Sequence, residues 1–226
     1  MKYLHWNQEN ITDFSVDKIE TMYENGYVFT RIDKGVMQQT RSLRIVIANF
    51  ELSSENKRIL KKIPDLAIKI LTLPLSDYDY SIGKIAKDFY ETKFGRGIMS
   101  VQKVKEMLTD TEKSNFNLLL NFQDGSRSKN NKSDLGTGFA ICYSSPSIIH
   151  YSYPFYDLND CSKDMGLAMM VKAVQYAKNN GFKYLYLGSL QRPTDVYKLQ
   201  FSGLEWFDGK IWNKDLIEAK KILALK

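Results

Sequence analysis

Residues 155–198 read FYDLNDCSKDMGLAMMVKAVQYAKNNGFKYLYLGSLQRPTDVYK. An aromatic strand end leads through a polar loop into a segment whose apolar residues recur at helical spacing, namely Leu167, Met170, Val171, Val174 and Ala177. Asn179-Asn180-Gly181 ends this helix, because glycine readily adopts the left-handed conformation of a helix C-terminus. Residues 183–188 then form a strand. The order strand, helix, strand predicts a parallel crossover, and this crossover decides the fold.

The loop before this helix, KDMGLA at residues 163–168, resembles the basic-x-x-Gly-x-Gly/Ala loop of acyltransferases of the GNAT superfamily. In that superfamily, backbone N–H groups at a helix start hold the phosphate of the acyl donor, as unpaired N–H groups and the helix dipole favour. The resemblance implies four donor-binding residues here: Lys163, Gly166, Leu167 and Gly188. A glycine near a helix start is also ordinary, so the loop alone leaves both interpretations open.

A wider set of motifs resembles the arginyl- and leucyl-tRNA–protein transferases. FYD at 155–157, Gly166, YLYLG at 184–188 and YK at 197–198 occur in the same order in that family. LRI at 43–45, SSENKR at 53–58 and GKIW at 209–212 extend the resemblance over residues 25–212, as islands between divergent sequence. These enzymes modify proteins by moving an amino acid from charged tRNA to an N-terminus, and their catalytic half has a GNAT-like fold.

One departure concerns the N-terminal part of that family, which carries a cysteine-rich segment. Residues 31–44 stand at this place and contain no cysteine, so we expect no iron–sulfur cluster, haem or metal. The resemblance implies a reduced N-terminal segment over residues 1–63 and a GNAT-like catalytic domain over residues 64–226. The departure also puts in doubt whether the family's substrate preferences apply to this chain.

Composition sets broad limits. The 226 residues are 43% hydrophobic, which is enough for one sizeable core. Lys and Arg number 32 against 26 Asp and Glu, and this net charge of +6 permits a nucleic-acid partner without requiring one. Cys142 and Cys161 cannot form a disulfide framework or a metal cluster. No apolar run approaches the roughly 18–20 residues of a membrane span. We therefore expect a cytoplasmic, monomeric protein that does not enter a membrane.

The element order predicts a mixed α/β protein with a GNAT-like acyltransferase fold. Its central sheet is expected to be mixed, mostly antiparallel, splayed in the middle and flanked by helices. Strands are expected at 27–32, 43–50, 66–73, 116–122, 136–143 and 147–155, with a hairpin at 206–212. Helices are expected at 16–23, 55–63, 78–94, 101–109 and 214–225. Pro154 lies where the splay should be, although a simple bulge or strand end would also explain a proline there.

The resemblance implies four catalytic residues: Tyr156, Asp157, Tyr197 and Lys198. The alternatives are a buried tyrosine hydroxyl beside a loop-capping aspartate, and a lysine on a solvated helix surface. Four basic residues form the candidate RNA contact: Arg41, Arg44, Lys57 and Arg58. A solvated amphipathic helix is the alternative for the last two. The basic loop at 124–132 is interpreted as a hairpin connection rather than as an RNA contact.

Three functions remain in view. The first is an aminoacyl-tRNA–protein transferase-like enzyme that acts on a protein or peptide N-terminal amine and needs no cofactor. Its donor ester is already activated and its acceptor amine has a pKa near ~8, so most of the catalysis can come from positioning. An acidic acceptor would need a cation, for which Lys198, Arg192 and Arg44 are candidates. The second is an acetyl-CoA-dependent N-acyltransferase of the GNAT type, and the third is a non-catalytic RNA- or peptide-binding relative.

Overall fold

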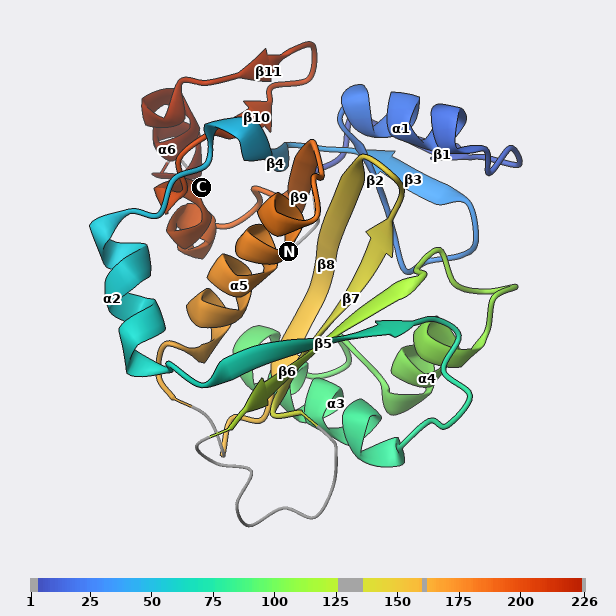
Figure 1. Ribbon diagram of the computed structural model, residues 1–226. Helices are drawn as coiled ribbons and strands as arrows, with labels where there is room; N and C mark the ends of the chain where they lie inside the picture. The colour runs from blue at the N-terminus through green and yellow to red at the C-terminus, as the bar shows by residue number, and fades with distance from the viewer. Residues whose placement is uncertain (1–3, 126–135, 160–161, 225–226) are drawn as a thin grey trace. The chain divides into compact units, whose positions relative to one another are not determined.

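The computed structural model describes residues 4–125, 136–159 and 162–224 (Figure 1). By its internal contacts the chain divides into two compact units. The first unit comprises residues 1–53, 144–151 and 177–226, and the second comprises residues 54–143 and 152–176. Both units are therefore built from segments far apart in the sequence. They differ from the expected segments 1–63 and 64–226, and a separate role for residues 1–63 stays a prediction.

The main sheet has eight strands in the order β11-β10-β4-β9-β8-β7-β6-β5. Strand β8 pairs with β9 in parallel, and the other registers that we describe are antiparallel. The expected mixed α/β class, with a mostly antiparallel mixed sheet and flanking helices, is confirmed. The strands are β4 (Ser42–Val46), β5 (Leu66–Thr72), β6 (Leu118–Asp124), β7 (Gly138–Ser144), β8 (Ile148–Tyr156), β9 (Tyr184–Ser189), β10 (Leu204–Phe207) and β11 (Trp212–Asn213).

Strand β8 passes from the first unit into the second. Its register with β9 runs from Ile148 opposite Tyr184 to His150 opposite Tyr186. Pro154 lies beyond the last of these pairs, where its missing N–H breaks no described ladder bond. The carbonyl of Pro154 accepts a hydrogen bond from the Tyr90 hydroxyl at 3.2 Å. The proline thus lies beyond the described β8–β9 pairs. This position is compatible with the expected splay between the two strands.

The first unit also contains a small sheet in the order β1-β3-β2, formed by Asn7–Asn10, Val36–Gln39 and Tyr27–Phe29. Helix α1 (Val16–Glu24) begins at Ser15, whose hydroxyl accepts the Lys18 N–H. Helix α6 (Leu216–Ala224) contacts β10, and α1 contacts β2. Strands β1 and β3 were not predicted, because their sequences NQEN and VMQQ lack apolar alternation. Pairing with neighbouring strands rather than local preference therefore makes these residues strands.

Strand β4 ends earlier than expected. The predicted strand 43–50 stops at Val46, and Ile47–Asn49 form a 3-10 turn. The Val46 N–H donates to Gly203 and the Ile47 N–H donates to Lys183, so two different segments take the ladder bonds here. Phe50 then turns inward and is 2% exposed. The apolar residues after Val46 therefore bury their side chains without extending the strand.

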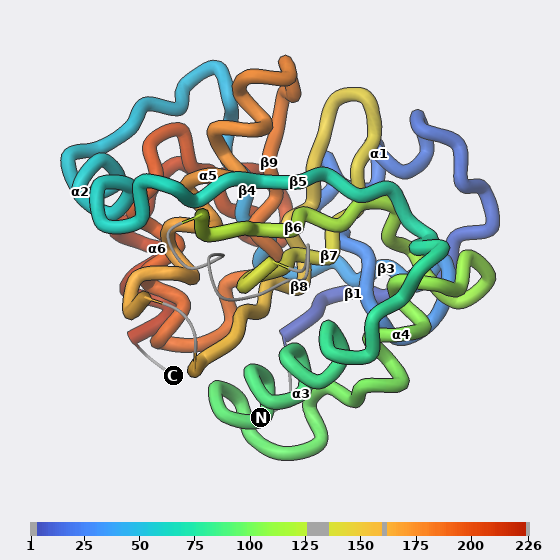
Figure 2. The backbone as a smooth tube through the Cα atoms, turned by 60° about the horizontal axis from the view of Figure 1, so that its bottom comes forward, coloured from blue at the N-terminus to red at the C-terminus, as the bar shows by residue number. Residues whose placement is uncertain are grey.

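The second unit packs helices α2 (Ser54–Lys62), α3 (Tyr80–Phe94) and α4 (Val101–Thr109), together with most of α5 (Met165–Asn179). Figure 2 shows β5, β6 and β7 running side by side, as their registers require. Gly138 on β7 explains how closely α5 approaches: a Cβ there would lie 2.7 Å from Met169 Sδ and 3.0 Å from Met165 Cε. Glycine thus leaves room for the ends of the Met165 and Met169 side chains, which would have to shift for a larger residue.

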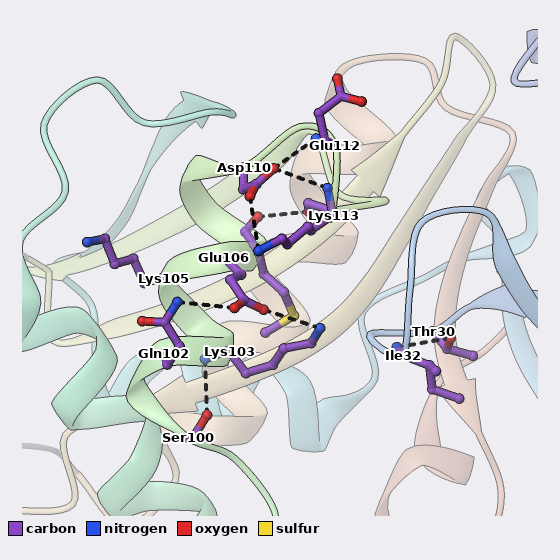
Figure 3. A network of polar contacts seen from close by, with 12 residues as sticks. Thr30, Ile32, Ser100, Gln102, Lys103, Lys105, Glu106, Asp110, Glu112 and Lys113 are labelled. Atoms are coloured by element: carbon purple, nitrogen blue, oxygen red, sulfur yellow. Dashed lines mark hydrogen bonds and ion pairs between the residues drawn. The ribbon is translucent and has the colours of Figure 1, made fainter.

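Polar contacts fix the ends of α4 (Figure 3). The Ser100 hydroxyl accepts the Lys103 N–H at 3.0 Å and caps the first turn. Along the helix, Gln102 donates to Glu106 at 3.1 Å, and this bond lowers the pKa of the Glu106 carboxyl. After the last turn, Asp110 Oδ1 accepts two backbone N–H groups, at 3.0 and 3.2 Å. Local sequence therefore suffices to explain where this helix begins and ends.

Candidate functional site

The start of α5 lies in the second unit, after the end of β8. The Met165 N–H donates to the Ser162 carbonyl at 3.0 Å, whereas the Leu167 and Ala168 N–H groups donate to the Asp164 carbonyl at 3.1 and 2.9 Å. These bonds form the first turn from the loop that the sequence singled out. The donor-binding candidates Lys163, Gly166 and Leu167 lie on this turn, with Lys163 exposed and Leu167 half-buried.

Two predicted site residues meet here, one expected in catalysis and one in donor binding. A Cβ on Gly166 would lie 3.1 Å from Tyr156 Cε1 and 3.5 Å from the Tyr156 hydroxyl oxygen. The Tyr156 ring also has an aromatic neighbour. It meets the Phe89 ring edge to face, and the two ring centres are 4.8 Å apart. Gly166 therefore has a packing reason: it lets the Tyr156 ring lie against the helix start.

Asp157 follows Tyr156 and is half-buried. Its N–H donates to the Thr137 carbonyl at 2.9 Å, which ties the end of β8 to residues just before β7. Its carboxylate oxygen Oδ1 accepts the Asn159 N–H at 2.9 Å. This is the geometry of an aspartate that caps a loop, one of the two interpretations of Asp157. The second carboxylate oxygen remains available for other chemistry.

An ion pair joins the start of α5 to helix α2. The Asp164 carboxylate pairs with the Lys62 ammonium, and this hydrogen bond lowers the pKa of the Asp164 carboxyl. An anion that approaches the helix start would be repelled by Asp164 alone. Because Lys62 offsets that charge and the exposed Lys163 adds a cation, the helix start keeps a net positive character.

In the first unit, Lys198 points inward although it follows the exposed Tyr197. The Lys198 side chain is 14% exposed, and its Nζ donates to the Ser189 carbonyl at 3.1 Å. Asp195 Oδ1 lies 3.9 Å from the ammonium. Burial, and to a lesser extent Arg192, lowers the pKa of Lys198, while Asp195 opposes that shift. Lys198 is thus a buried amine that gives up its proton more readily than a surface lysine.

The segment that carries these residues is a 3-10 helix, η3 (Pro193–Gln200), rather than an α-helix. With three residues per turn, side chains at adjacent positions point about a third of a turn apart. Tyr197 is 44% exposed, whereas the Lys198 side chain is 14% exposed. Gly188, just before the carbonyl that Lys198 contacts, has φ +71° and would place a Cβ with no atom within 4 Å. A side chain at Gly188 would therefore be disfavoured by the left-handed backbone conformation and not by crowding.

Arg44 has strong partners inside the protein. Its Nε and NH2 groups donate to Glu205 Oε2 at 2.9 and 2.8 Å. Its guanidinium carbon lies 4.1 Å from the centre of the Tyr184 ring and 4.0 Å from that of the Trp212 ring. Arg44 is 8% exposed. An RNA phosphate would therefore have to compete with Glu205, which sets Arg44 apart from the other basic candidates.

The other three RNA-binding candidates differ in exposure. Lys57 and Arg58 are exposed on α2, where Arg58 forms an ion pair with Glu55 one turn earlier. Arg41, which precedes β4, is 8% exposed. Only the α2 pair is placed as surface phosphate contacts usually are.

Sequence reasoning treated His150 as structural and did not identify Asp195 or Glu205. The buried His150 Nδ1 lies 2.9 Å from the Tyr23 hydroxyl. Burial, assisted by the nearby Lys198 charge, lowers the pKa of His150 to about 3. Asp195 accepts the Gln191 and Arg192 N–H groups at 2.8 and 2.9 Å. Its position three residues before Lys198 was a readable signal, because residues at that spacing are neighbours on a helix.

Within residues 4–125, 136–159 and 162–224, no three His, Cys, Asp or Glu side chains gather as metal ligands would. Cys142 is buried, which raises the pKa of its thiol, and Cys161 lies outside the described residues. The basic loop 124–132 lies outside them from residue 126 onward. The described helices also include none that is long and apolar enough to cross a bilayer.

No protein-family model matches the chain. It is 24% identical over 151 residues to an aspartate/glutamate leucyltransferase from Methylobacterium sp. (strain 4-46), covering 65% of this chain and 60% of that relative. The chain thus matches less than two thirds of the relative's length. Among solved structures it is similar to L-PGS from Bacillus licheniformis, with 10% identity, 93% and 70% of the two chains covered and a TM-score of 0.47.

A second solved structure is a GCN5-related glucosamine N-acetyltransferase region of a fungal β-N-acetylglucosaminidase. It shows 7% identity, with 88% of this chain and 22% of that chain covered and a TM-score of 0.48. Both TM-scores are below 0.5, so neither likeness bears on function. The sequence similarity, by contrast, is to an enzyme named for transferring an aminoacyl group.

Proposed function

We propose that this chain is an acyltransferase of the aminoacyl-tRNA–protein transferase type, which moves an amino acid from charged tRNA to the N-terminal amine of a protein or peptide. The similarity to a leucyltransferase over 151 residues carries this proposal. The parallel β8–β9 pair joined by α5 supports it, because three of the motifs that resemble that family, FYD, Gly166 and YLYLG, lie on or directly after these elements. The proposal includes no cofactor, a cytoplasmic location and a monomer.

The chemistry places modest demands on the protein. The acceptor nitrogen attacks the ester carbonyl, the bond from that carbonyl to the ribose oxygen breaks, and the amine proton ends on the ribose oxygen. Because an α-amine has a pKa near ~8, a useful fraction is uncharged at neutral pH. Most of the rate enhancement can then come from holding amine and ester together. A proton relay is the remaining need, and an amine with a lowered pKa suits it.

Within the first unit we assign that relay to Lys198. Its lowered pKa follows from burial, and its Nζ is held by the carbonyl of Ser189, the residue after Gly188. Tyr197 is exposed on the same 3-10 segment and is proposed to contact substrate from the surface. Asp195 keeps Lys198 in place through the backbone bonds that fix the segment.

Within the second unit we assign donor binding to the start of α5. Lys163 supplies an exposed cation. Gly166 has no side chain, and the Tyr156 ring packs next to its backbone. A phosphate near the 3′ end of the tRNA would approach the Lys163 ammonium and the Gly166 N–H, because the Met165, Leu167 and Ala168 N–H groups already donate to loop carbonyls. Exposed Lys57 and Arg58 on α2 are proposed to contact the tRNA backbone further away.

Donor-induced thermal stabilisation tests the proposal. A ligand that binds only the folded state raises Tm, by an amount that grows with its concentration over Kd. We expect charged tRNA to raise Tm, uncharged tRNA to raise it less, and acetyl-CoA to leave it unchanged. Stabilisation by acetyl-CoA alone would favour the N-acetyltransferase alternative. Equal stabilisation by charged and uncharged tRNA, with no transfer to peptide, would favour a binding protein without catalysis.

A further inference from the structure

Arg41 is a buried cation without a carboxylate partner among the described residues. It precedes β4 and is 8% exposed. Its NH1 group makes a long hydrogen bond of 3.5 Å to the Leu190 carbonyl, and its buried Nε has no hydrogen-bond partner in the part of the chain that the structure describes. A guanidinium carries five N–H donors and keeps its charge in proteins. The buried Nε donor is therefore unused by the described residues.

Arg44, three residues further on, provides an internal comparison. Both arginines are 8% exposed. Arg44 donates twice to Glu205 and lies between two aromatic rings, whereas no described carboxylate lies within ion-pairing distance of Arg41. A buried charge is costly unless it is paired. Burial accordingly lowers the pKa of Arg41, and no neighbouring charge opposes that shift. The partner that Glu205 provides for Arg44 is absent for Arg41 among the described residues.

The polar groups around Arg41 are already paired with each other. Gln191 Nε2 donates to Thr40 Oγ1 at 2.7 Å and to the Leu4 carbonyl at 2.9 Å. Thr40 Oγ1 donates to the same Leu4 carbonyl at 2.7 Å. Since these acceptors are occupied, they do not compensate the guanidinium. The Arg41 Nε is therefore free to bind a partner from outside the described residues.

The local charge favours an anion. Lys198 rests on the Ser189 carbonyl, one residue before the Leu190 carbonyl that Arg41 contacts. The carboxylate of Asp195 lies 3.9 Å from Lys198 and is held by two backbone N–H groups. Arg41 and Lys198 therefore approach adjacent carbonyls, and the Asp195 carboxylate lies near Lys198. A Cβ on Gly188, two residues before Leu190, would meet no atom within 4 Å, so side chains do not crowd the backbone here.

We propose that Arg41 binds the carboxylate of an amino-acid or peptide ligand and thereby selects which acceptor the first unit receives. The guanidinium fork matches the two oxygens of a carboxylate. Its burial suits a small planar group at the end of a flexible chain. Phosphates of an RNA backbone are instead contacted by exposed cations, such as Lys57. The identity of the ligand as an acceptor rests on the proposed function, whereas carboxylate binding itself does not.

A matched set of peptides tests the proposal. A pentapeptide that begins with glutamate and its glutamine counterpart, each with a free and with an amidated C-terminus, are titrated into the full-length protein by calorimetry. We expect at least one carboxylate to improve Kd about tenfold, as a charged hydrogen-bonded pair does. The Glu/Gln difference measures a side-chain carboxylate, and the free/amidated difference measures a terminal one.

Three variants complete the test. Arg41→Met should abolish the carboxylate preference, and Arg41→Lys should keep part of it, because lysine retains charge without the fork. Arg96→Met, which removes one charge from a side chain that is 93% exposed, should leave the preference unchanged. The Tm of ligand-free Arg41→Met should equal or exceed that of the unmodified protein, because a buried unpaired charge is removed. A normal Tm of Arg41→Met would show that the variant is folded, so that any loss of binding is not due to unfolding.

Equal affinity of the unmodified protein for all four peptides would overturn the proposal. A carboxylate preference that persists in Arg41→Met would also overturn it. If Arg41→Met lost affinity for charged tRNA but kept its affinity for peptide, Arg41 would be a phosphate site and the proposal would be wrong. The titrations require no amino-acid transfer. Failure of transfer with intact carboxylate preference would therefore contradict the proposed function alone, and transfer with an unaffected Arg41→Met would contradict this inference alone.

Discussion

The ring of Tyr156 lies where a side chain on Gly166 would point. Helix propensity alone would make Gly166→Ala stabilising by up to ~1 kcal/mol. A Cβ at 3.1 Å from Tyr156 Cε1 works against this gain, because the ring must move. We predict that Gly166→Val lowers stability by about 1–3 kcal/mol, the usual range for overpacking. Thermal and urea unfolding measure the change.

The control for this prediction is the same substitution in a Tyr156→Ala background, where the crowding ring is absent. There Gly166→Val should cost much less than in the unmodified protein, and a double-mutant cycle gives the difference. Equal costs in both backgrounds would show that the ring is not what Gly166 accommodates. Titration of the folded variants with charged tRNA then reports separately on donor binding, which should weaken.

His150 gives a prediction about pH. Burial lowers its pKa from an ordinary value near ~6.5 to about 3 in the folded protein. Between these values the unfolded chain binds a proton that the folded protein does not, so stability falls as pH falls. Above the unfolded value the effect is absent. At pH 6.5 half of the unfolded chains carry the proton, so the slope rises toward roughly 1.4 kcal/mol per pH unit and the loss from pH 6.5 to 5 is about 1.6 kcal/mol.

The measurement is urea unfolding at several pH values for the unmodified protein and for His150→Gln, whose side chain keeps a partner for the Tyr23 hydroxyl but does not titrate. The variant should be less stable at pH 7.5 and lose less stability between pH 6.5 and 5. Parallel pH profiles for the two proteins would mean that His150 is protonated in the folded state over this range.

Helix α2 carries the prediction about RNA. Lys57 is exposed and has no ion pair among those we describe, whereas Arg58 already pairs with Glu55. Lys57→Glu should therefore weaken binding of charged tRNA uniformly and flatten its salt dependence by about one unit. The matched control is Lys220→Glu, an exposed lysine on α6 that changes net charge equally. An unchanged salt slope in Lys57→Glu, or equal effects of both variants, would exclude a specific contact at α2.

At the level of elements, the sequence predicts those whose apolar pattern is strong. Helices α1, α3, α4 and α5 and the crossover from β8 to β9 lie where periodicity and caps place them. Strands β1 and β3 could not be found in this way, because they depend on register with partners distant in sequence. The 3-10 form of η3 is set by Pro193 and by the bonds to Asp195, which helical periodicity does not report.

The same limit applies to the candidate site. Sequence reasoning identified Tyr156, Gly166 and Lys198, and the structure shows why each has a defined place. It did not foresee that Arg44 would be held by Glu205 on β10. Arg44 and Glu205 are 161 positions apart in the sequence, so only the register of β4 with β10 reveals their contact. The difference between Arg41 and Arg44 was likewise invisible, because both read as basic residues near one strand.

For the molecule as a whole, the account makes amino-acid transfer from tRNA its central claim. The most direct measurement incubates the protein with total charged tRNA and a set of peptides that differ in their N-terminal residue, and then determines peptide masses. We predict that peptides gain the mass of one aminoacyl residue at the N-terminus and that Lys198→Met greatly slows this gain. Mass additions from acetyl-CoA, but none from charged tRNA with any peptide, would contradict the claim.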